Sequence, residues 1–157
     1  AASLYEEYLK KAELKEAQRA EAHAALGEVY QSNLQPVQAV EQFMRVAIRY
    51  KDSPRYPDAL LSLGALLSAE RRWAAAFPYF EAFYQLYKDK PSGLTTPRMD
   101  EALFGMAQVY ENDPALRDMN KAMELYKLLL DKAPFSPLVA EAKKRIRYVE
   151  RNFLDVR

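Results

Sequence analysis

The sequence contains no cysteine, a single histidine and only four glycines among its 157 residues. Without cysteine, the chain can form neither disulfide bonds nor thiolate metal sites. The glycines lack phosphate-binding spacing, and the acidic residues show no metal-loop pattern. His23 has no thiol to activate, so a packing or surface role fits it better than catalysis. We therefore expect no cofactor, no metal site and no enzymatic activity.

Long apolar runs and a charge excess of one sign are also missing. No apolar run approaches the roughly 18 residues that a membrane helix needs. The net charge is +1, from 23 basic and 22 acidic residues, which argues against nucleic acid as the main partner. The N-terminus has no basic segment followed by an apolar stretch. We expect a cytosolic protein, or a mature form whose export signal has been removed.

What the chain does contain is an internal repeat. In the first half of each unit, an alanine is followed five residues later by glycine or alanine, and three residues after that by tyrosine or leucine. In the second half, another alanine is followed four residues later by an aromatic residue. Small residues at fixed offsets let paired helices approach closely, so each unit is interpreted as a helix hairpin. The three matches are Ala22, Gly27, Tyr30, Ala39 and Phe43; Ala59, Gly64, Leu67, Ala76 and Phe80; and Ala102, Ala107, Tyr110, Ala122 and Tyr126.

The unequal spacing of the units predicts two inserted loops. The first alanines of successive units, Ala22, Ala59, Ala102 and Ala142, lie 37, 43 and 40 residues apart. Alignment of the units assigns the extra residues to 91–97 and to 111–118, which are both turn-like segments. A stack of hairpins tolerates insertions at such places.

Several helix boundaries follow from local signals. Ser3 with Glu6 has the pattern of a capping box, which predicts a helical segment from Leu4 to Tyr30; whether it bends near Lys15 is left open. Pro36 stands at a favoured first-turn position. The final helix, 138–153, has one apolar stripe and a basic side, as a terminal capping helix needs. The stripe consists of Val139, Ala142, Ile146, Val149 and Phe153.

The predicted fold class is all-α, a right-handed solenoid of helix hairpins with about three repeats and a C-terminal capping helix. We expect one domain over residues 1–157. Its predicted parts are an N-terminal helical extension (1–19), repeat 1 (20–55), repeat 2 with its inserted loop (56–97), repeat 3 (98–137) and the capping helix (138–157).

The repeat resembles the tetratricopeptide repeat (TPR). The Leu-Gly and tyrosine signature of its first helix is matched by 26–27 with Tyr30, by 63–64 with Leu67 and by 106–107 with Tyr110. The turns 50–54 and 133–137 are in addition similar to those of bacterial envelope repeat proteins of the BamD and TolA-binding protein type. This narrower resemblance implies a place in outer-membrane protein assembly.

The resemblance implies a binding face lined by the first helix of each repeat. Leu61 and Phe104 either pack between hairpins or form an apolar pocket for a partner. Ala24, Glu28, Ser62, Glu101 and Gly105 occupy the places where chaperone-tail receptors carry a carboxylate clamp, so no such clamp is expected. The implied lining is Ala24, Glu28, Gln31, Leu61, Ala65, Ser68, Phe104, Gln108 and Glu111.

Two charged features allow alternatives. Glu21, Asp58, Glu101 and Glu141 each precede the first alanine of a unit, and they form either solvated helix starts or an acidic strip beside a peptide groove. The basic residues of the last helix form either a solvated cap or a partner face. They are Lys143, Lys144, Arg145, Arg147 and Arg151, and the possible partner face consists of Lys143, Lys144, Arg147 and Arg151.

The predicted function is a non-catalytic scaffold that binds protein or peptide partners, in bacterial envelope assembly or maintenance. The envelope resemblance implies a periplasmic or outer-membrane-associated location, and a cytoplasmic location is expected otherwise. The alternative is a regulatory or substrate-recruiting domain of a larger enzyme.

Overall fold

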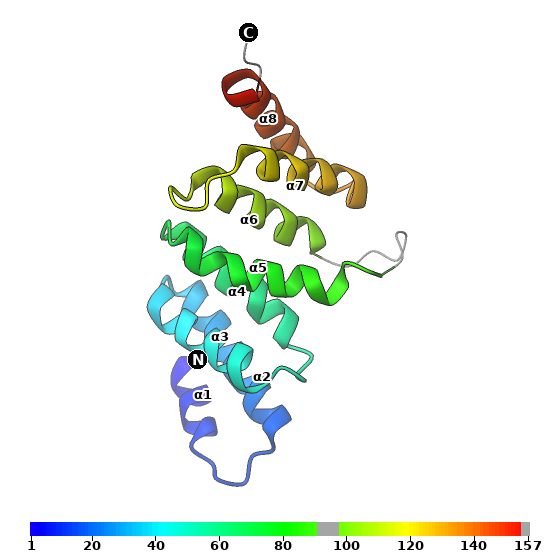
Figure 1. Ribbon diagram of the computed structural model, residues 1–157. Coiled ribbons are helices and arrows are strands. Elements are labelled where there is room, and N and C mark those ends of the chain that lie inside the picture. Colours follow the sequence, from blue (N-terminus) through cyan, green and yellow to red (C-terminus); the bar gives the residue numbers. More distant parts are fainter. Residues whose placement is uncertain (91–97, 155–157) are drawn as a thin grey trace. The chain divides into compact units, whose positions relative to one another are not determined.

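The structure, a computed structural model, describes residues 1–90 and 98–154. These residues form helices and connecting turns, with no strand among them, as the sequence predicts (Figure 1). The inserted loop predicted at 91–97 lies outside the described residues. The chain divides into two compact units, Ala1–Leu66 and Leu67–Arg157. The predicted repeat boundaries stay a prediction.

The first unit contains α1 (Ala2–Leu9), α2 (Glu16–Ser32), α3 (Pro36–Arg49) and most of α4 (Tyr56–Ala69). The helical segment predicted from Leu4 to Tyr30 is therefore two helices, separated by residues 10–15. The Arg19 guanidinium donates hydrogen bonds to the carbonyl oxygens of Leu9 (3.2 Å) and Lys11 (2.9 Å). The bond to Leu9 satisfies a carbonyl that the end of α1 leaves without a helical partner, and the bond to Lys11 holds the segment between the two helices.

The predicted capping box at the N-terminus does not form. Ser3 lies inside α1, whose N-cap is Ala1 and makes no side-chain hydrogen bond. Glu6 instead accepts a hydrogen bond from the hydroxyl of Tyr30 on α2. The Glu6 carboxylate, which a capping box would use, therefore contributes to the contact between α1 and α2.

The hairpin of α2 and α3 is closed by a ring lying over a glycine. Pro36 begins α3, as predicted. A Cβ atom added to Gly27 would lie 2.8 Å from Cε1 of Phe43, closer than side chains pack. Phe43 and Ala39 are themselves buried, with 2% and 0% of their surface exposed. The structure confirms the close approach that the repeat spacing predicts for these helices.

The second unit contains the end of α4 and then α5 (Trp73–Tyr87), α6 (Met99–Asn112), α7 (Met119–Lys132), α8 (Val139–Val149) and the π-helical turn η1 (Glu150–Leu154). Each of α5 to α8 packs on the next helix in the chain (Figure 1). The predicted insertion at 111–118 falls largely in the α6–α7 loop. Asp113 orders this loop by accepting hydrogen bonds from the backbone N–H groups of Ala115 and Leu116.

The contact between α5 and α6 repeats the ring-over-glycine arrangement. A Cβ atom added to Gly105 would lie 2.5 Å from Cζ of Phe80 and 2.6 Å from two further ring atoms. Gly105, which the resemblance places at a clamp position, is therefore a packing residue. The repeat residues Ala102, Ala107 and Tyr126 are fully buried in the same unit.

The capping helix follows its predicted stripe only as far as Val149. Ala142, Ile146 and Val149 are buried, but Phe153 is 40% exposed. The chain passes from α8 into η1 after Val149, and the wider turn moves later residues out of the α-helical register. Phe153 then packs edge to face on Tyr148, with ring centroids 5.9 Å apart.

We expect Gly105→Ala to lower the free energy of unfolding by ~1–3 kcal/mol, because the added methyl group collides with a buried ring. This expected loss is the net effect, after the ~1 kcal/mol of helix propensity that alanine offers over glycine. Urea denaturation followed by circular dichroism measures the change. The double variant Gly105→Ala with Phe80→Leu should recover part of the loss. A single variant as stable as the parent would contradict this packing.

Candidate functional site

The nine side chains predicted to line a binding face differ widely in exposure. Three of them are buried, with 2% of Ala24, 2% of Leu61 and 4% of Glu111 exposed. These three cannot meet a partner, so for Leu61 the packing alternative holds over the apolar pocket. The others are exposed (Glu28, Gln31, Ala65) or half-buried (Ser68, Phe104, Gln108).

In the first unit, one arginine pairs with two glutamates of α2, of which Glu21 is one of the predicted acidic positions. Arg55, in the α3–α4 turn, forms ion pairs with Glu28 (2.5 Å) and Glu21 (3.7 Å) of α2. In the second unit, Glu101 forms a 2.5 Å ion pair with Arg98. An arginine beside each carboxylate offsets its charge. For Glu21 and Glu101, these pairs favour the interpretation of solvated helix starts over an acidic strip. For Asp58 and Glu141, both alternatives stay a prediction.

In the second unit, one outward stripe of α6 keeps side chains at the surface. Glu101, Phe104 and Gln108 follow one another at spacings of three and four residues, which places them on one side of the helix. The ring of Phe104 packs edge to face on Tyr126, with centroids 5.4 Å apart, and the residue remains partly exposed. We call these three residues the α6 surface. It offers an apolar ring between two polar groups.

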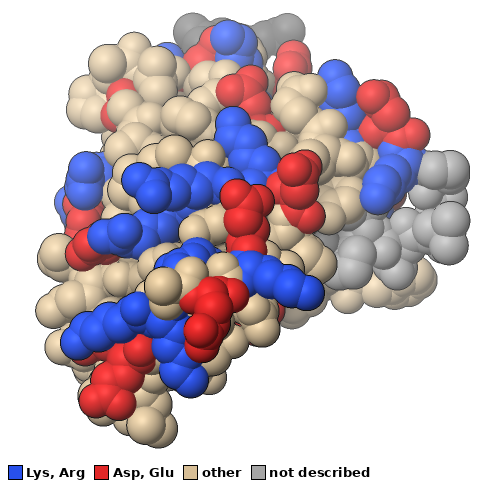
Figure 2. Space-filling model, turned by 90° about the horizontal axis from the view of Figure 1, so that it is seen from below, with Lys and Arg blue, Asp and Glu red and all other residues tan. Residues whose placement is uncertain are grey.

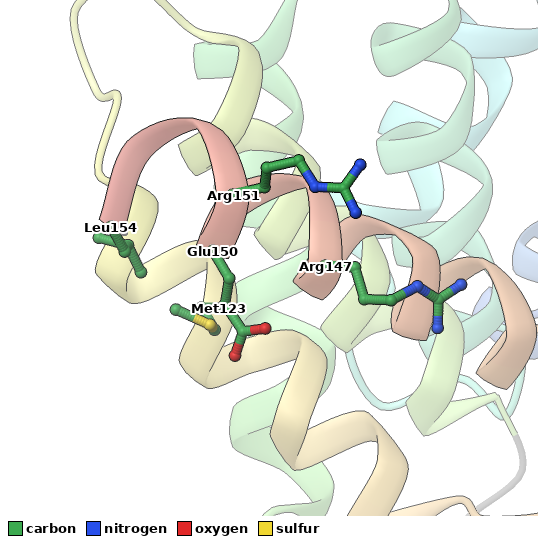
Figure 3. A pocket seen from close by; sticks show the side chains of 5 residues that line it. All are labelled: Met123, Arg147, Glu150, Arg151 and Leu154. Carbon is green, nitrogen blue, oxygen red and sulfur yellow. The ribbon is translucent and has the colours of Figure 1, made fainter. Parts of the chain in front are cut away.

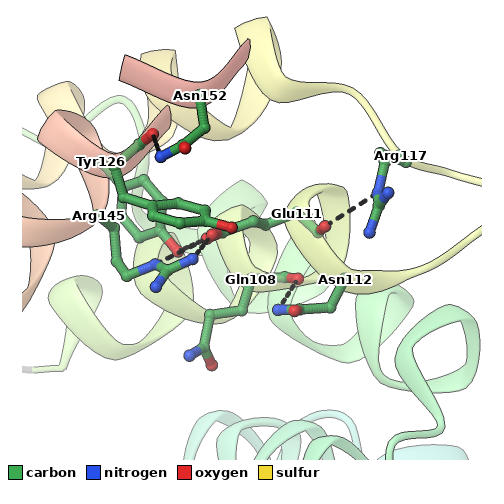
Figure 4. Close-up of polar contacts among 8 residues, drawn as sticks. Gln108, Glu111, Asn112, Arg117, Tyr126, Arg145 and Asn152 are labelled. Atoms are coloured by element: carbon green, nitrogen blue, oxygen red, sulfur yellow. Dashed lines mark hydrogen bonds and ion pairs between the residues drawn. The ribbon is translucent and has the colours of Figure 1, made fainter. Parts of the chain in front are cut away.

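Glu111, the last predicted lining residue, belongs to a buried polar cluster instead (Figure 4). Its carboxylate accepts a 2.7 Å hydrogen bond from the Tyr126 hydroxyl of α7 and forms an ion pair with Arg145 of α8. Arg145 Nε also donates to Glu111 Oε2 at 3.2 Å. Burial raises the pKa of Tyr126, so its hydroxyl stays protonated as a donor. The cluster ties the end of α6 to α7 and α8.

Arg145 is therefore not part of the exposed basic side of the last helix. Its side chain is 28% exposed and turns toward Glu111, while its guanidinium also lies over the Tyr148 ring at 4.5 Å. The sequence identifies Arg145 only as one basic residue among several. Its partner, Glu111, lies 34 residues earlier in the sequence, so the spacing of residues along one helix does not reveal the pair.

We expect Glu111→Ala to lower the free energy of unfolding by ~1–3 kcal/mol, because it leaves the guanidinium and the hydroxyl without their buried acceptor. Urea denaturation measures the loss. Glu41→Ala is the matched control, since it removes an exposed ion pair with Arg45 and should cost under ~1 kcal/mol. Equal losses in the two variants would contradict a special role of the buried cluster.

The remaining basic residues lie at the surface of α8 and η1. Lys143 and Lys144 are exposed. Arg147 and Arg151 line a hollow of about 580 Å³ beside α7, together with Met123, Glu150 and Leu154 (Figure 3). Glu150 within the hollow reduces its positive charge. On the face of the molecule in Figure 2, basic and acidic side chains are interspersed.

The single histidine is part of the α2–α3 packing. Its Nδ1 lies 2.7 Å from Oε1 of Gln42, and its ring stacks near Tyr50 with centroids 6.1 Å apart. Burial lowers the pKa of His23 below 6.5, against the opposing effect of the Gln42 hydrogen bond, and nearby arginines including Arg45 lower it further. These contacts give His23 a structural role.

We expect the parent protein to lose stability relative to a His23→Gln variant as the pH falls below about 6.5. The unfolded chain binds a proton at the ordinary histidine pKa, whereas the folded chain binds it only at lower pH. The stabilising contribution is therefore present above that pKa and is lost below it. Urea denaturation of both proteins at several pH values measures the difference, and a constant difference would contradict the lowered pKa.

Cofactor and membrane features can be checked in residues 1–90 and 98–154. This part of the chain has no group of three or more histidine, aspartate or glutamate side chains placed to hold a metal ion. None of its helices combines the length and apolar character needed to cross a membrane.

Comparison with known proteins gives matches mainly at the level of structure. No protein-family description matches the chain. An uncharacterized protein of Treponema pallidum (strain Nichols) is 39% identical over 59 residues, which are 38% of this chain and 11% of that protein. The chain thus matches only about a tenth of the length of that relative.

Two solved structures share the fold. The first TPR of Spaghetti (RPAP3), bound to the HSP90 peptide SRMEEVD, superposes with a TM-score of 0.67 at 15% identity, covering 89% of this chain and 97% of that one. The crystal structure of MamA superposes with a TM-score of 0.72 at 19% identity, covering 96% of this chain and 75% of that one. The chain therefore has the tetratricopeptide-repeat fold, as its repeat spacing predicts.

Proposed function

We propose that this chain, with its tetratricopeptide-repeat fold, is a non-catalytic interaction module that binds a segment of a partner protein. The observation that carries this proposal is the α6 surface. There, Phe104 keeps part of its ring exposed between Glu101 and Gln108 on a first helix of a repeat. A partly exposed aromatic ring on a helix is a suitable anchor for a partner. The RPAP3 repeat, which has the same fold, is bound to a peptide.

The chemistry of the partner segment differs from that of the RPAP3 peptide. The sequence SRMEEVD ends with acidic residues. In this chain, the positions implied for a carboxylate clamp include Ala24, which is buried, and Gly105, which Phe80 covers. Neither position offers a positive charge. The proposed partner segment is therefore neutral or basic, with an apolar side chain that packs on Phe104.

The envelope assignment is the finer part of the proposal. It rests on the turns 50–54 and 133–137, which resemble those of BamD-type proteins. In the structure, Ser53 and Ser136 each accept a hydrogen bond from a backbone N–H two residues later. Both turns are thus held by the same hydrogen bond from a backbone N–H group to a serine hydroxyl. A scaffold in outer-membrane protein assembly or maintenance, in the periplasm or at the outer membrane, is the corresponding proposal.

A recruiting domain within a larger enzyme is the second candidate. The observation in its favour is that the Treponema pallidum relative is far longer than the segment it shares with this chain. The full gene sequence separates the two candidates. A catalytic domain in the same chain supports recruitment, and an export signal with a lipidated cysteine supports the envelope scaffold.

We expect Phe104→Ala to weaken partner binding by ~1 kcal/mol or more, because the substitution removes the apolar anchor of the α6 surface. Pull-down from a cell-envelope fraction with the parent protein identifies the partner, and calorimetry with the purified partner measures the affinity. Circular dichroism shows that the variant is folded. The peptide SRMEEVD should not bind the parent.

The control for this test is a variant with Lys143, Lys144 and Arg147 changed to serine. These side chains lie on α8, so the variant should bind the partner as the parent does. Loss of affinity in the α8 variant alone would move the binding site to the basic face and overturn the α6 surface.

A further inference from the structure

A second hollow lies within the second unit, between α5 and α7 and over α6. Its volume is about 320 Å³. Phe77, Glu81 and Tyr84 of α5 line one wall at spacings of four and three residues, so they share one side of that helix. On α7, Leu125 and Leu128 line the other wall. We call this hollow the α5–α7 groove.

The groove lies on the opposite side of α6 from the α6 surface. Met106 and Tyr110 of α6 line the groove. Each follows a residue of the α6 surface, Phe104 or Gln108, by two positions, which corresponds to a rotation of about 200° around the helix axis. A partner bound at the α6 surface therefore leaves the groove free.

The walls of the groove are apolar and only partly covered. The rings of Phe77 and Tyr110 pack edge to face with centroids 5.2 Å apart, which fixes their position. Phe77, Tyr84, Leu125 and Leu128 are all half-buried. Covering these apolar side chains removes them from water, which favours a bound segment.

The charge at the rim of the groove is negative. Glu81 and Glu124 are exposed, and neither has an ion pair or hydrogen bond with another residue in the described part of the chain. Lys121 has partners of its own, since its ammonium lies 3.9 Å from Asp118 and 5.4 Å from the Tyr110 ring centroid. The two carboxylates are thus left to meet a positive partner.

We propose that the α5–α7 groove is a second docking site, which takes a helical segment of another protein with apolar side chains flanked by lysine or arginine. The apolar side chains pack between Tyr84 and Leu125, and the basic groups reach Glu81 and Glu124. This assignment is independent of the α6 surface. The chain can then hold two partners at once.

Synthetic helical peptides test the proposal. The first peptide has leucines along one side and lysines beside them; a second has glutamate in place of each lysine, and a third has serine in place of each leucine. Calorimetry at physiological salt should show that the first peptide binds at least ~10-fold more tightly than either of the others. Equal binding by the glutamate peptide or by the serine peptide would overturn the proposed partner chemistry.

A matched pair of charge variants locates the binding. Glu81→Lys with Glu124→Lys should weaken binding of the lysine peptide by ~10-fold or more. Glu7→Lys with Glu13→Lys changes the net charge equally at two exposed positions of the first unit, and should change the affinity by less than ~2-fold. Equal loss in both variants would show a general charge effect and overturn the site.

Amide chemical shifts of the labelled protein complete the test. Addition of the lysine peptide should shift amide signals on the groove sides of α5 and α7. Shifts confined to the α6 surface or to the first unit would overturn the groove as the binding site. A protein that is dimeric by sedimentation, and becomes monomeric in the Glu81→Lys, Glu124→Lys variant, would show that a second copy fills the groove and would likewise overturn the proposal.

Discussion

The fold depends on rings that lie against glycines of the neighbouring helix. Phe43 covers Gly27 between α2 and α3, and Phe80 covers Gly105 between α5 and α6. In each case the ring occupies the space that a Cβ atom would need. Because the helices approach so closely, the side that each one buries is fixed by packing, and packing tolerates little change of volume. The same ring-to-glycine contacts therefore also determine which side of each helix remains at the surface.

Local spacing explains why much of this core could be predicted. Ala39 and Phe43, or Ala122 and Tyr126, are four residues apart on one helix, and all four are buried. A pattern of small and large residues within one hairpin is visible in the sequence because its members are close in the chain. The hairpins, the fold class and the α6–α7 loop follow from it. The contact of Phe80 with Gly105 was not predicted, because the repeat pattern places Ala107, two residues later, at the signature position.

Other features depend on partners that sequence spacing does not reveal. Residues 10–15 contain neither glycine nor proline, so helix propensity favours one continuous helix. Docking of α1 through Glu6 and Arg19 overrides that propensity. Glu111 has the spacing of a residue that lines the binding face, but its carboxylate is buried in contact with Arg145 and Tyr126. Arg55 pairs with Glu28 across 27 residues in the same way.

The two sides of α6 offer partners different chemistry. The Glu101 carboxylate beside Phe104 is paired with Arg98, so the attraction available there is mainly that of an apolar ring. In the α5–α7 groove, Glu81 and Glu124 lie beside an apolar wall formed by Phe77, Tyr84, Leu125 and Leu128. An apolar contact tolerates many partner sequences, whereas a fixed arrangement of charges around an apolar floor rejects segments of the wrong sign. We therefore expect the proposed groove to select its partner more sharply than the proposed α6 surface, although both include residues of α6.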